Sequence, residues 1–455
     1  MNRSNLSLAS AYGIAFLGYV ALMYFTPRQN FYQVLGLVTL LFATYGWIYR
    51  QTSSLKHYQI GIVVAIVIRL ALVFALPNLS DDFYRFVWDG RLLVNEVSPF
   101  AYLPSQFFDG TYTGEPIVGI NETLLHQLNS PNYFTIYPPV CQLVFYVACY
   151  LFPNDLYSAT VVMKGFLFAF ECSSIYGLHL MVKRFGLEAK KVLLYALNPL
   201  VIIELTGNLH FEGAMICFML WAIYLLPPKF SISNPLLFLT LIPSAIAMGL
   251  AVCAKLLPLI FLPLLIRRIG WWKAFFYGVV VAITILICFV PILDTQLLTS
   301  LGASVGLYFQ KFEFNASIYY LIRAFGYWYY GWNIIGTAGK FLALATLLLI
   351  LCLAFKEKTP TYRTFPNAML FALLIYFALA TIVHPWYATS LVALCVFTSF
   401  RFPIVWSLLI VLTYQTYATT SYTENLMLVA FTYTLVYTYF FWEWRQYRQV
   451  SSNRR

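Results

Sequence analysis

The sequence "LSDDFYRFVWDGR" at 79–91 holds three aspartates and two arginines directly after an almost wholly apolar stretch. Two adjacent carboxylates, Asp81 and Asp82, next to a cation at a membrane surface could act as a general base towards a hydroxyl group. The alternative is structural: an amphipathic helix at the membrane interface whose acidic residues stabilise its first turn and pair with arginine. From the residue types alone, the structural alternative is the stronger of the two.

The same stretch predicts a short helix over residues 81–89. Ser80 is suited to cap its beginning, and the glycine after Asp89 is suited to end it. On such a helix Asp82, Arg85 and Asp89 share one face, because they are spaced by three and four residues. Two carboxylates and a cation would then line one side of a helix at the mouth of a membrane segment.

The elements around this stretch are those of a polytopic membrane protein. Of the 455 residues, 61% are hydrophobic and only 10% are charged, and the mean hydropathy is +0.75. A transmembrane helix needs about 20 apolar residues, and about fourteen segments are predicted on that basis: 10–25, 31–50, 58–77, 158–182, 190–206, 213–227, 235–251, 254–266, 272–292, 336–355, 366–383, 386–400, 403–420 and 425–442. We therefore expect an all-α fold and a single domain over residues 1–455.

The basic residues indicate the orientation. The chain has a net charge of +11, and its lysines and arginines collect in short connectors such as 183–191. This distribution is typical of cytoplasmic loops of a membrane protein and not of a nucleic-acid-binding surface. With the amino terminus inside, three spans place 78–136 outside, and one of the next two apolar stretches must not cross. We expect 136–152 to lie in the outer interface, because paired prolines begin it. The long outer loops are then 78–136 and 293–335.

Several cofactor classes lack their sequence signals. The eight cysteines lie in or beside apolar segments without a C-x-x-C pair or a histidine cluster, so neither a disulfide framework nor a zinc site is predicted. No G-x-x-x-x-G-K-[ST] run or dinucleotide fingerprint is present, so no nucleotide cofactor is expected. No cofactor is predicted with certainty, and whether a divalent metal assists the chemistry is left open.

The run "DDFYRFVWDGR", followed by "SPFAYLP" at 98–104, resembles the first outer loop of the GT-C superfamily, the integral-membrane glycosyltransferases that use polyprenyl-phosphate sugars. The similarity is strongest to the mannosyltransferase branches, although Ser98-Pro99-Phe100 stands where they have Asn-Pro-Tyr. Further matching runs follow in the family's order: "IYPPVCQLVF" (136–145), "ALNPLVIIELTGNLHFE" (196–212), "KLLPLIFLPLL" (255–265), "FEFNASIYYL" (312–321) and "HPWY" (384–387).

The resemblance implies a GT-C-like bundle of about 12–14 transmembrane helices with interfacial helices in its long outer loop. It also implies transfer of a hexose, with mannose favoured, from a polyprenyl-phosphate donor to a glycan or lipid-linked acceptor on the outer face. A bacterial cytoplasmic membrane is the favoured location. Asp82, or else Asp81, would be the base, and Asp82 is preferred because it fits the family's D-x-Y-R register.

The remaining site candidates follow from what the reaction needs. A departing phosphate needs cations or hydrogen-bond donors, and a sugar ring needs aromatic side chains to stack on. The candidate cations are Arg85, Arg91, Lys255 and Arg323, and the candidate donors are His210 and His384. The candidate stacking residues are Trp88, Tyr137, Trp386 and Tyr387, and the predicted substrate-binding set is completed by Asp89 and Glu212.

Charged residues in apolar segments have structural alternatives. His210 lies in a tight turn and is equally well explained as a structural histidine. Lys255 is harder to explain structurally, because a charge at a helix centre costs about 3 kcal/mol and tends to face a cavity or an interface. Arg69 is expected to pair with a loop carboxylate or to bind phosphate, with equal weight. Lys164 and Glu171, seven residues apart, indicate internal pairing.

Two other function classes are compatible with so many spans. A secondary transporter or lipid flippase would show paired half-repeats with broken helices, and no second copy of the acidic loop is present. A polysaccharide polymerase or ligase would be expected to place its key residues in a large later loop. The glycosyltransferase remains the favoured interpretation.

Overall fold

The computed structural model describes residues 3–227, 235–419 and 422–452. Within these ranges the chain is helical and forms no β-strand, apart from an isolated bridge between Phe314 and Ile382. The prediction of an all-α membrane protein is confirmed.

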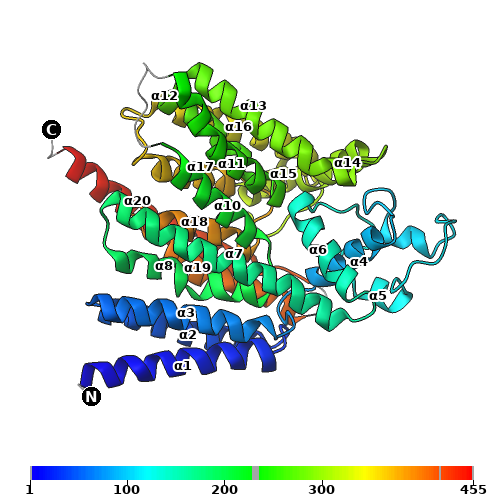
Figure 1. The fold of residues 1–455 in the computed structure, drawn as a ribbon, viewed down its shortest axis with the longest axis horizontal. Helices are drawn as coiled ribbons and strands as arrows, with labels where there is room; N and C mark the ends of the chain where they lie inside the picture. The colour runs from blue at the N-terminus through cyan, green and yellow to red at the C-terminus, as the bar shows by residue number, and fades with distance from the viewer. Residues whose placement is uncertain (1–2, 228–234, 420–421, 453–455) are drawn as a thin grey trace.

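Six helices in the described residues are long and apolar enough to cross a membrane. They are α1 (Arg3–Phe25), α2 (Phe31–Gln51), α3 (Leu55–Val73), α7 (Leu156–Phe185), α13 (Trp271–Phe289) and α16 (Ile335–Lys356). The first three lie side by side along one edge of the molecule, and α3 packs against α7 (Figure 1). The number of continuous spanning helices is smaller than the expected total of about 12–14.

The predicted spans 190–206 and 213–227 are not two straight helices. They form η2 (Ala189–Val192), α8 (Leu193–Ala196), α9 (Pro199–Val201), the π-helix η3 (Ile202–Gly207) and α10 (Glu212–Leu225). The segment Pro199–Gly207 is bent by 113° from α10, so the pair is a broken span or a re-entrant loop. Pro199 cannot donate a backbone hydrogen bond, and Leu209 has a φ of +63° at the bend.

Proline also interrupts the later apolar segments. The predicted span 254–266 is a 3₁₀ stretch, η5 (Leu257–Leu265), with Pro263 inside it. The remaining elements after α10 are η4 (Pro235–Leu241), α11 (Ile242–Ala254), α12 (Ile266–Ile269), η6 (Val290–Ile292), α14 (Leu297–Gln310), α15 (Ile318–Tyr330), α17 (Phe365–Leu379), η7 (Pro385–Tyr387), α18 (Ala388–Cys395), α19 (Phe402–Leu409), η8 (Ile410–Ala418) and α20 (Leu426–Ser452).

The loop predicted at 78–136 forms a compact unit at one end of the bundle (Figure 1). It contains α4 (Asp82–Val94), η1 (Pro104–Phe107) and α5 (Glu122–Gln127), and α6 (Pro139–Leu151) follows it and packs against α4. With 13 residues, α6 is shorter than the roughly 20 that a span needs, as the expected non-crossing segment requires.

Helix α4 differs from the predicted 81–89 helix at both ends. Its N-cap position is occupied by Asp81, while Ser80 Oγ accepts a hydrogen bond from the Asp82 backbone N–H at 3.3 Å. The helix also runs through Gly90. A Cβ at Gly90 would collide with the Phe145 carbonyl oxygen and lie 2.7 Å from Cys149 Sγ, so this glycine allows α4 and α6 to approach closely and does not end the helix.

Gly90→Ala is therefore expected to lower stability by about 1–3 kcal/mol despite the better helix propensity of alanine. The measurement is the thermal unfolding midpoint of the protein in detergent. Gly165→Ala in α7 is the matched control, because a Cβ there meets nothing within 4 Å. Equal midpoints for the two variants would contradict the close packing of α4 on α6.

Candidate active site

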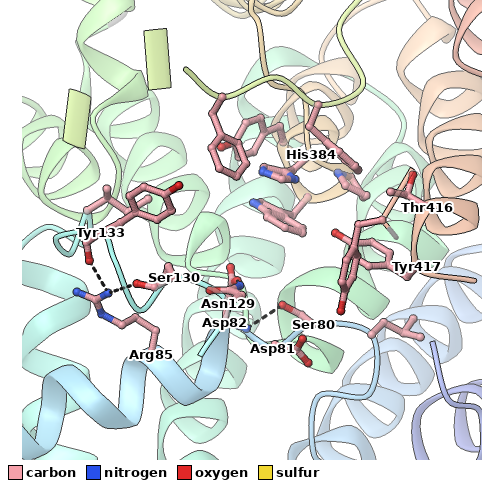
Figure 2. A pocket seen from close by; sticks show the side chains of 18 of the residues that line it. Ser80, Asp81, Asp82, Arg85, Asn129, Ser130, Tyr133, His384, Thr416 and Tyr417 are labelled. Atoms are coloured by element: carbon pink, nitrogen blue, oxygen red, sulfur yellow. Dashed lines mark hydrogen bonds between the residues drawn. The ribbon is translucent and has the colours of Figure 1, made fainter. Parts of the chain in front are cut away.

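A cavity of about 530 Å³ lies where segments far apart in the sequence meet. Figure 2 shows it bordered by the start of α4, by the loop that carries Asn129, and by residues before α18 and in η8. Among the predicted site residues, those lining it are Asp81, Asp82, Arg85, Tyr137, Lys255, His384, Trp386 and Tyr387. The polar segments that the sequence assigns to one side of the membrane thus surround one cavity.

Asp82 presents its carboxylate to this cavity at the first turn of α4. Its Oδ1 accepts a hydrogen bond from Asn129 Nδ2 at 2.7 Å, and its Oδ2 accepts one from the Tyr137 hydroxyl at 3.4 Å. The side chain is 21% exposed. The carboxylate is held in place and remains accessible, which is what a general base requires.

The neighbouring Asp81 has a different environment. It forms an ion pair with Arg28, which comes from the turn between α1 and α2 and lies 5.0 Å from the centre of the Tyr417 ring. Burial raises the pKa of the Asp81 carboxyl, and the Arg28 guanidinium opposes that rise. Asp81 is thus engaged with a cation, whereas Asp82 accepts hydrogen bonds from the neutral side chains of Asn129 and Tyr137.

Arg85 connects α4 to the loop that carries Asn129. Its Nε bonds Asp89 Oδ1 at 2.8 Å, and its Nη1 donates to the carbonyls of Ser130 and Tyr133 at 3.2 and 2.9 Å (Figure 2). Asp89 is fully buried and also bonds Thr135. The predicted common face of α4 is confirmed for this pair, but the pair fastens the loop that carries Asn129 to the helix.

Lys255 lines the cavity at the end of α11. Its ammonium group lies 3.1 Å from Glu212 Oε1 and 5.3 Å from the centre of the Tyr137 ring, and its side chain is 22% exposed. Burial alone would lower the pKa of Lys255, but the Glu212 carboxylate and other neighbours raise it above its ordinary value. The cation therefore persists at neutral pH and faces the cavity.

A stack of three rings, from His210, Trp386 and His384, adjoins the cavity. Trp386 lies 3.8 Å from the His210 ring and 4.4 Å from the His384 ring, measured between centroids. Burial lowers the pKa of His384 to about 3, so this side chain is neutral at physiological pH. His384 therefore supplies a neutral imidazole, not a cation, to this site.

Other predicted site residues lie away from the cavity lining. Trp88 is fully buried and packs with Leu92 beneath the 98–128 segment. Arg91 donates to the Gly119 carbonyl at 2.6 Å. Arg323 pairs with Glu313, and Glu313 lines the cavity in its place.

The buried charged residues Arg69 and Lys164 also have partners other than those predicted. Arg69 pairs with Glu171 on α7 at 3.1 Å, so its partner is neither a loop carboxylate nor a ligand phosphate. Lys164 donates to the Ala75 and Gly207 carbonyls and does not bond Glu171. These contacts join helices, which explains why such charges are present in apolar segments.

Among the residues that sequence reasoning missed are Arg28 and Asn129, which line the cavity, and Glu204, which lies beside His210. Arg28 had a signal, since an arginine in a short outer turn departs from the usual placement of basic residues. Glu204 had one as well, because a carboxylate inside an apolar segment indicates function by default. Asn129 had none, because only the folded loop brings it to Asp82.

A second cavity, of about 520 Å³, adjoins the first and is almost wholly apolar. Ile136 and Tyr387 line both cavities. Leu256, the residue after Lys255, lines the second. Its walls come mainly from η5, α16 and α17. The apolar groove therefore adjoins the cavity that Lys255 lines.

Among the described residues, no group of three or more histidine, cysteine, aspartate or glutamate side chains is placed to hold a metal ion. The polar groups that the fold brings to the site include Asp82, the Lys255–Glu212 pair and the ring stack.

Comparison with known families gives one match. Residues 13–270, more than half of the chain, match a family described as alpha-(1->6)-mannopyranosyltransferase, N-terminal domain. The matched part contains Asp82, His210 and Lys255, whereas Trp386 and its neighbours lie beyond it. A search of curated proteins found no match to the chain.

Proposed function

The chain belongs to the alpha-(1->6)-mannopyranosyltransferase family, and from that premise we propose that it transfers mannose from a polyprenyl-phosphate donor to a hydroxyl of a glycan or lipid-linked acceptor. Family membership makes it a glycosyltransferase, and its apolar helices make it an integral membrane protein. The transporter and flippase alternatives lose their support. The donor class, the acceptor and the side of the membrane are the proposed parts.

One observation carries the donor assignment: the polar cavity that contains Lys255 and Asp82 adjoins an apolar groove. A polyprenyl-phosphate sugar has the same sequence of chemistry, with a hydrocarbon chain, a phosphate and a sugar ring. The groove accommodates the chain, Lys255 attracts the phosphate, and the sugar lies in the polar cavity near Asp82. A nucleotide-linked sugar has no apolar part to fill the groove.

The reaction then follows from the side chains around the cavity. The acceptor hydroxyl transfers its proton to the Asp82 carboxylate while its oxygen attacks the anomeric carbon. The bond from that carbon to the phosphate oxygen breaks, and its electron pair leaves with the phosphate. Lys255 stabilises the charge that develops on the leaving phosphate. Asn129 and Tyr137 orient the base through their hydrogen bonds to it.

We place the cavity on the outer side of a bacterial cytoplasmic membrane. Three spanning helices precede Asp82, and the basic connector 183–191 lies beyond α6 and one further span. The cavity takes residues from the loops at 78–136 and 293–335 and from segments after both, so the whole of 1–455 is proposed to act as one catalytic domain.

The test of this function is donor consumption by the purified protein in lipid nanodiscs. Polyprenyl-phosphate mannose, glucose and arabinose and a nucleotide-diphosphate mannose are supplied separately with a mannan acceptor. We expect release of polyprenyl phosphate from the mannose donor, and little turnover with the nucleotide sugar. Turnover of the nucleotide sugar alone would contradict the proposed donor class.

A further inference from the structure

We propose that Glu204 is a positioning residue that holds His210 ready to take the catalytic proton from Asp82. His210 Nδ1 lies 3.1 Å from Glu204 Oε2 and 3.0 Å from the Glu204 carbonyl oxygen. Two acceptors around Nδ1 place the hydrogen on that nitrogen. The lone pair on Nε2 then faces the other way.

On that other side are the groups of the reacting centre. His210 Nε2 lies 3.3 Å from Ser80 Oγ and 3.9 Å from Asp82 Oδ2. Asp82, His210 and Glu204 therefore stand in series, a base followed by an imidazole followed by an orienting carboxylate. The same order of roles lets a histidine accept and hold a proton in other enzymes.

The surroundings of Glu204 suit this role. The carboxylate is fully buried in the π-helix η3, a kind of distortion that is frequent at functional sites. It accepts hydrogen bonds from the Tyr414 hydroxyl at 2.6 Å and from Asn208 Nδ2 at 3.2 Å. A fixed carboxylate in water-poor surroundings stabilises a positive imidazolium more strongly than an exposed one does.

The inferred step is a proton transfer from Asp82 to His210, and it rests on the proposed function. Asp82 receives the acceptor's proton as the new bond to the anomeric carbon forms and the phosphate departs. That proton passes to His210 Nε2 through a bridging water, because 3.9 Å is too long for a direct hydrogen bond, and the Asp82 carboxylate is restored. His210 then gives the proton to water when product has left and water enters the cavity.

The pH dependence follows from the charges around His210. Besides Glu204, the titratable side chains near it are Asp82, Tyr414, the Lys255–Glu212 pair and, beyond Trp386, His384. His210 accepts a proton only in its neutral form, so activity is expected to fall at low pH. Glu204 places a negative charge beside Nδ1, where it stabilises the protonated imidazole, so removal of that charge is expected to move this acid limb to lower pH.

Glu204→Gln tests the inference. We expect the plateau turnover at pH 8 to fall about 10–30-fold, the KM for the donor to change less than about twofold, and the acid limb to shift down by about one pH unit. Glu443→Gln is the matched control, because Glu443 accepts backbone hydrogen bonds from Arg401 and Phe402 far from the cavity. A lower plateau with an unmoved acid limb would overturn the proposal.

Two further measurements keep the inference independent of folding and of the donor. His210→Gln should leave only the loss of activity at low pH that protonation of Asp82 itself causes, and adding Glu204→Gln to it should move that limb no further. A further shift in the double variant would contradict the relay. Labelled histidine NMR of the protein without donor should show a lower pKa for His210 in Glu204→Gln than in the natural protein. If the His210 titration is the same in Glu204→Gln and in the natural protein, the role of Glu204 is overturned. If the titration shifts as expected but the natural protein shows no turnover, the result counts only against the proposed function.

Discussion

Replacing Asp82 with asparagine is expected to lower turnover about 100-fold or more while the protein still inserts and binds its donor. Asparagine keeps the size and much of the hydrogen bonding of Asp82 but cannot take a proton from the acceptor hydroxyl. Donor affinity should change little, because the proposed binding places the phosphate at Lys255 and the lipid chain in the apolar groove, away from residue 82. The measurement is kcat from released polyprenyl phosphate at matched expression.

Two carboxylates beside it serve as controls. Asp81→Asn should cost much less turnover, because that carboxylate is paired with Arg28. Asp89→Asn should lower stability more than kcat, because Asp89 is buried against Arg85 and Thr135. Turnover near the natural level in both Asp82→Asn and Asp81→Asn would show that the start of α4 is an interfacial anchor without a catalytic base.

Lys255→Met is the second large effect, with kcat/KM for the donor expected to fall about 100-fold. Removing one preorganised group that stabilises developing negative charge typically has this cost. The variant also leaves the Glu212 carboxylate without its cation, which destabilises the fold.

The double variant Lys255→Met with Glu212→Gln separates the two effects. It removes the unpaired carboxylate and should restore the unfolding midpoint without restoring turnover. Lys255→Arg should retain much of the activity, because it keeps a cation at the same place. A double variant with natural turnover would mean that the phosphate binds away from Lys255.

The spanning helices that the sequence predicted well are those with continuous apolar runs. Helices α1, α2, α3, α13 and α16 fall close to their predicted ranges, because nothing within them interrupts the backbone hydrogen bonds. Hydropathy cannot distinguish such a run from a folded-back one. The segment 190–206 is also rich in apolar residues, yet it bends. Pro199 lies within it, and its buried Glu204 accepts a hydrogen bond from Tyr414 of η8.

The site was predictable in location but not in detail. Charge at the mouth of a membrane segment pointed to Asp81, Asp82 and Lys255, and all three line the cavity. Residue type could not separate Asp82 from Asp89. Asp89 shares its helix face but is buried and accepts a hydrogen bond from Thr135. That difference depends on where residues 129–137 fold over α4, a long-range contact without a local signal.

The central claim is that one ligand joins the apolar groove, Lys255 and Asp82. The most direct measurement is a structure of the inactive Asp82→Asn protein with polyprenyl-phosphate mannose bound. We expect the phosphate within about 3 Å of Lys255 Nζ, the chain along η5 and α16, and the anomeric carbon facing residue 82. A phosphate bound away from Lys255, with the sugar outside the cavity, would contradict the account.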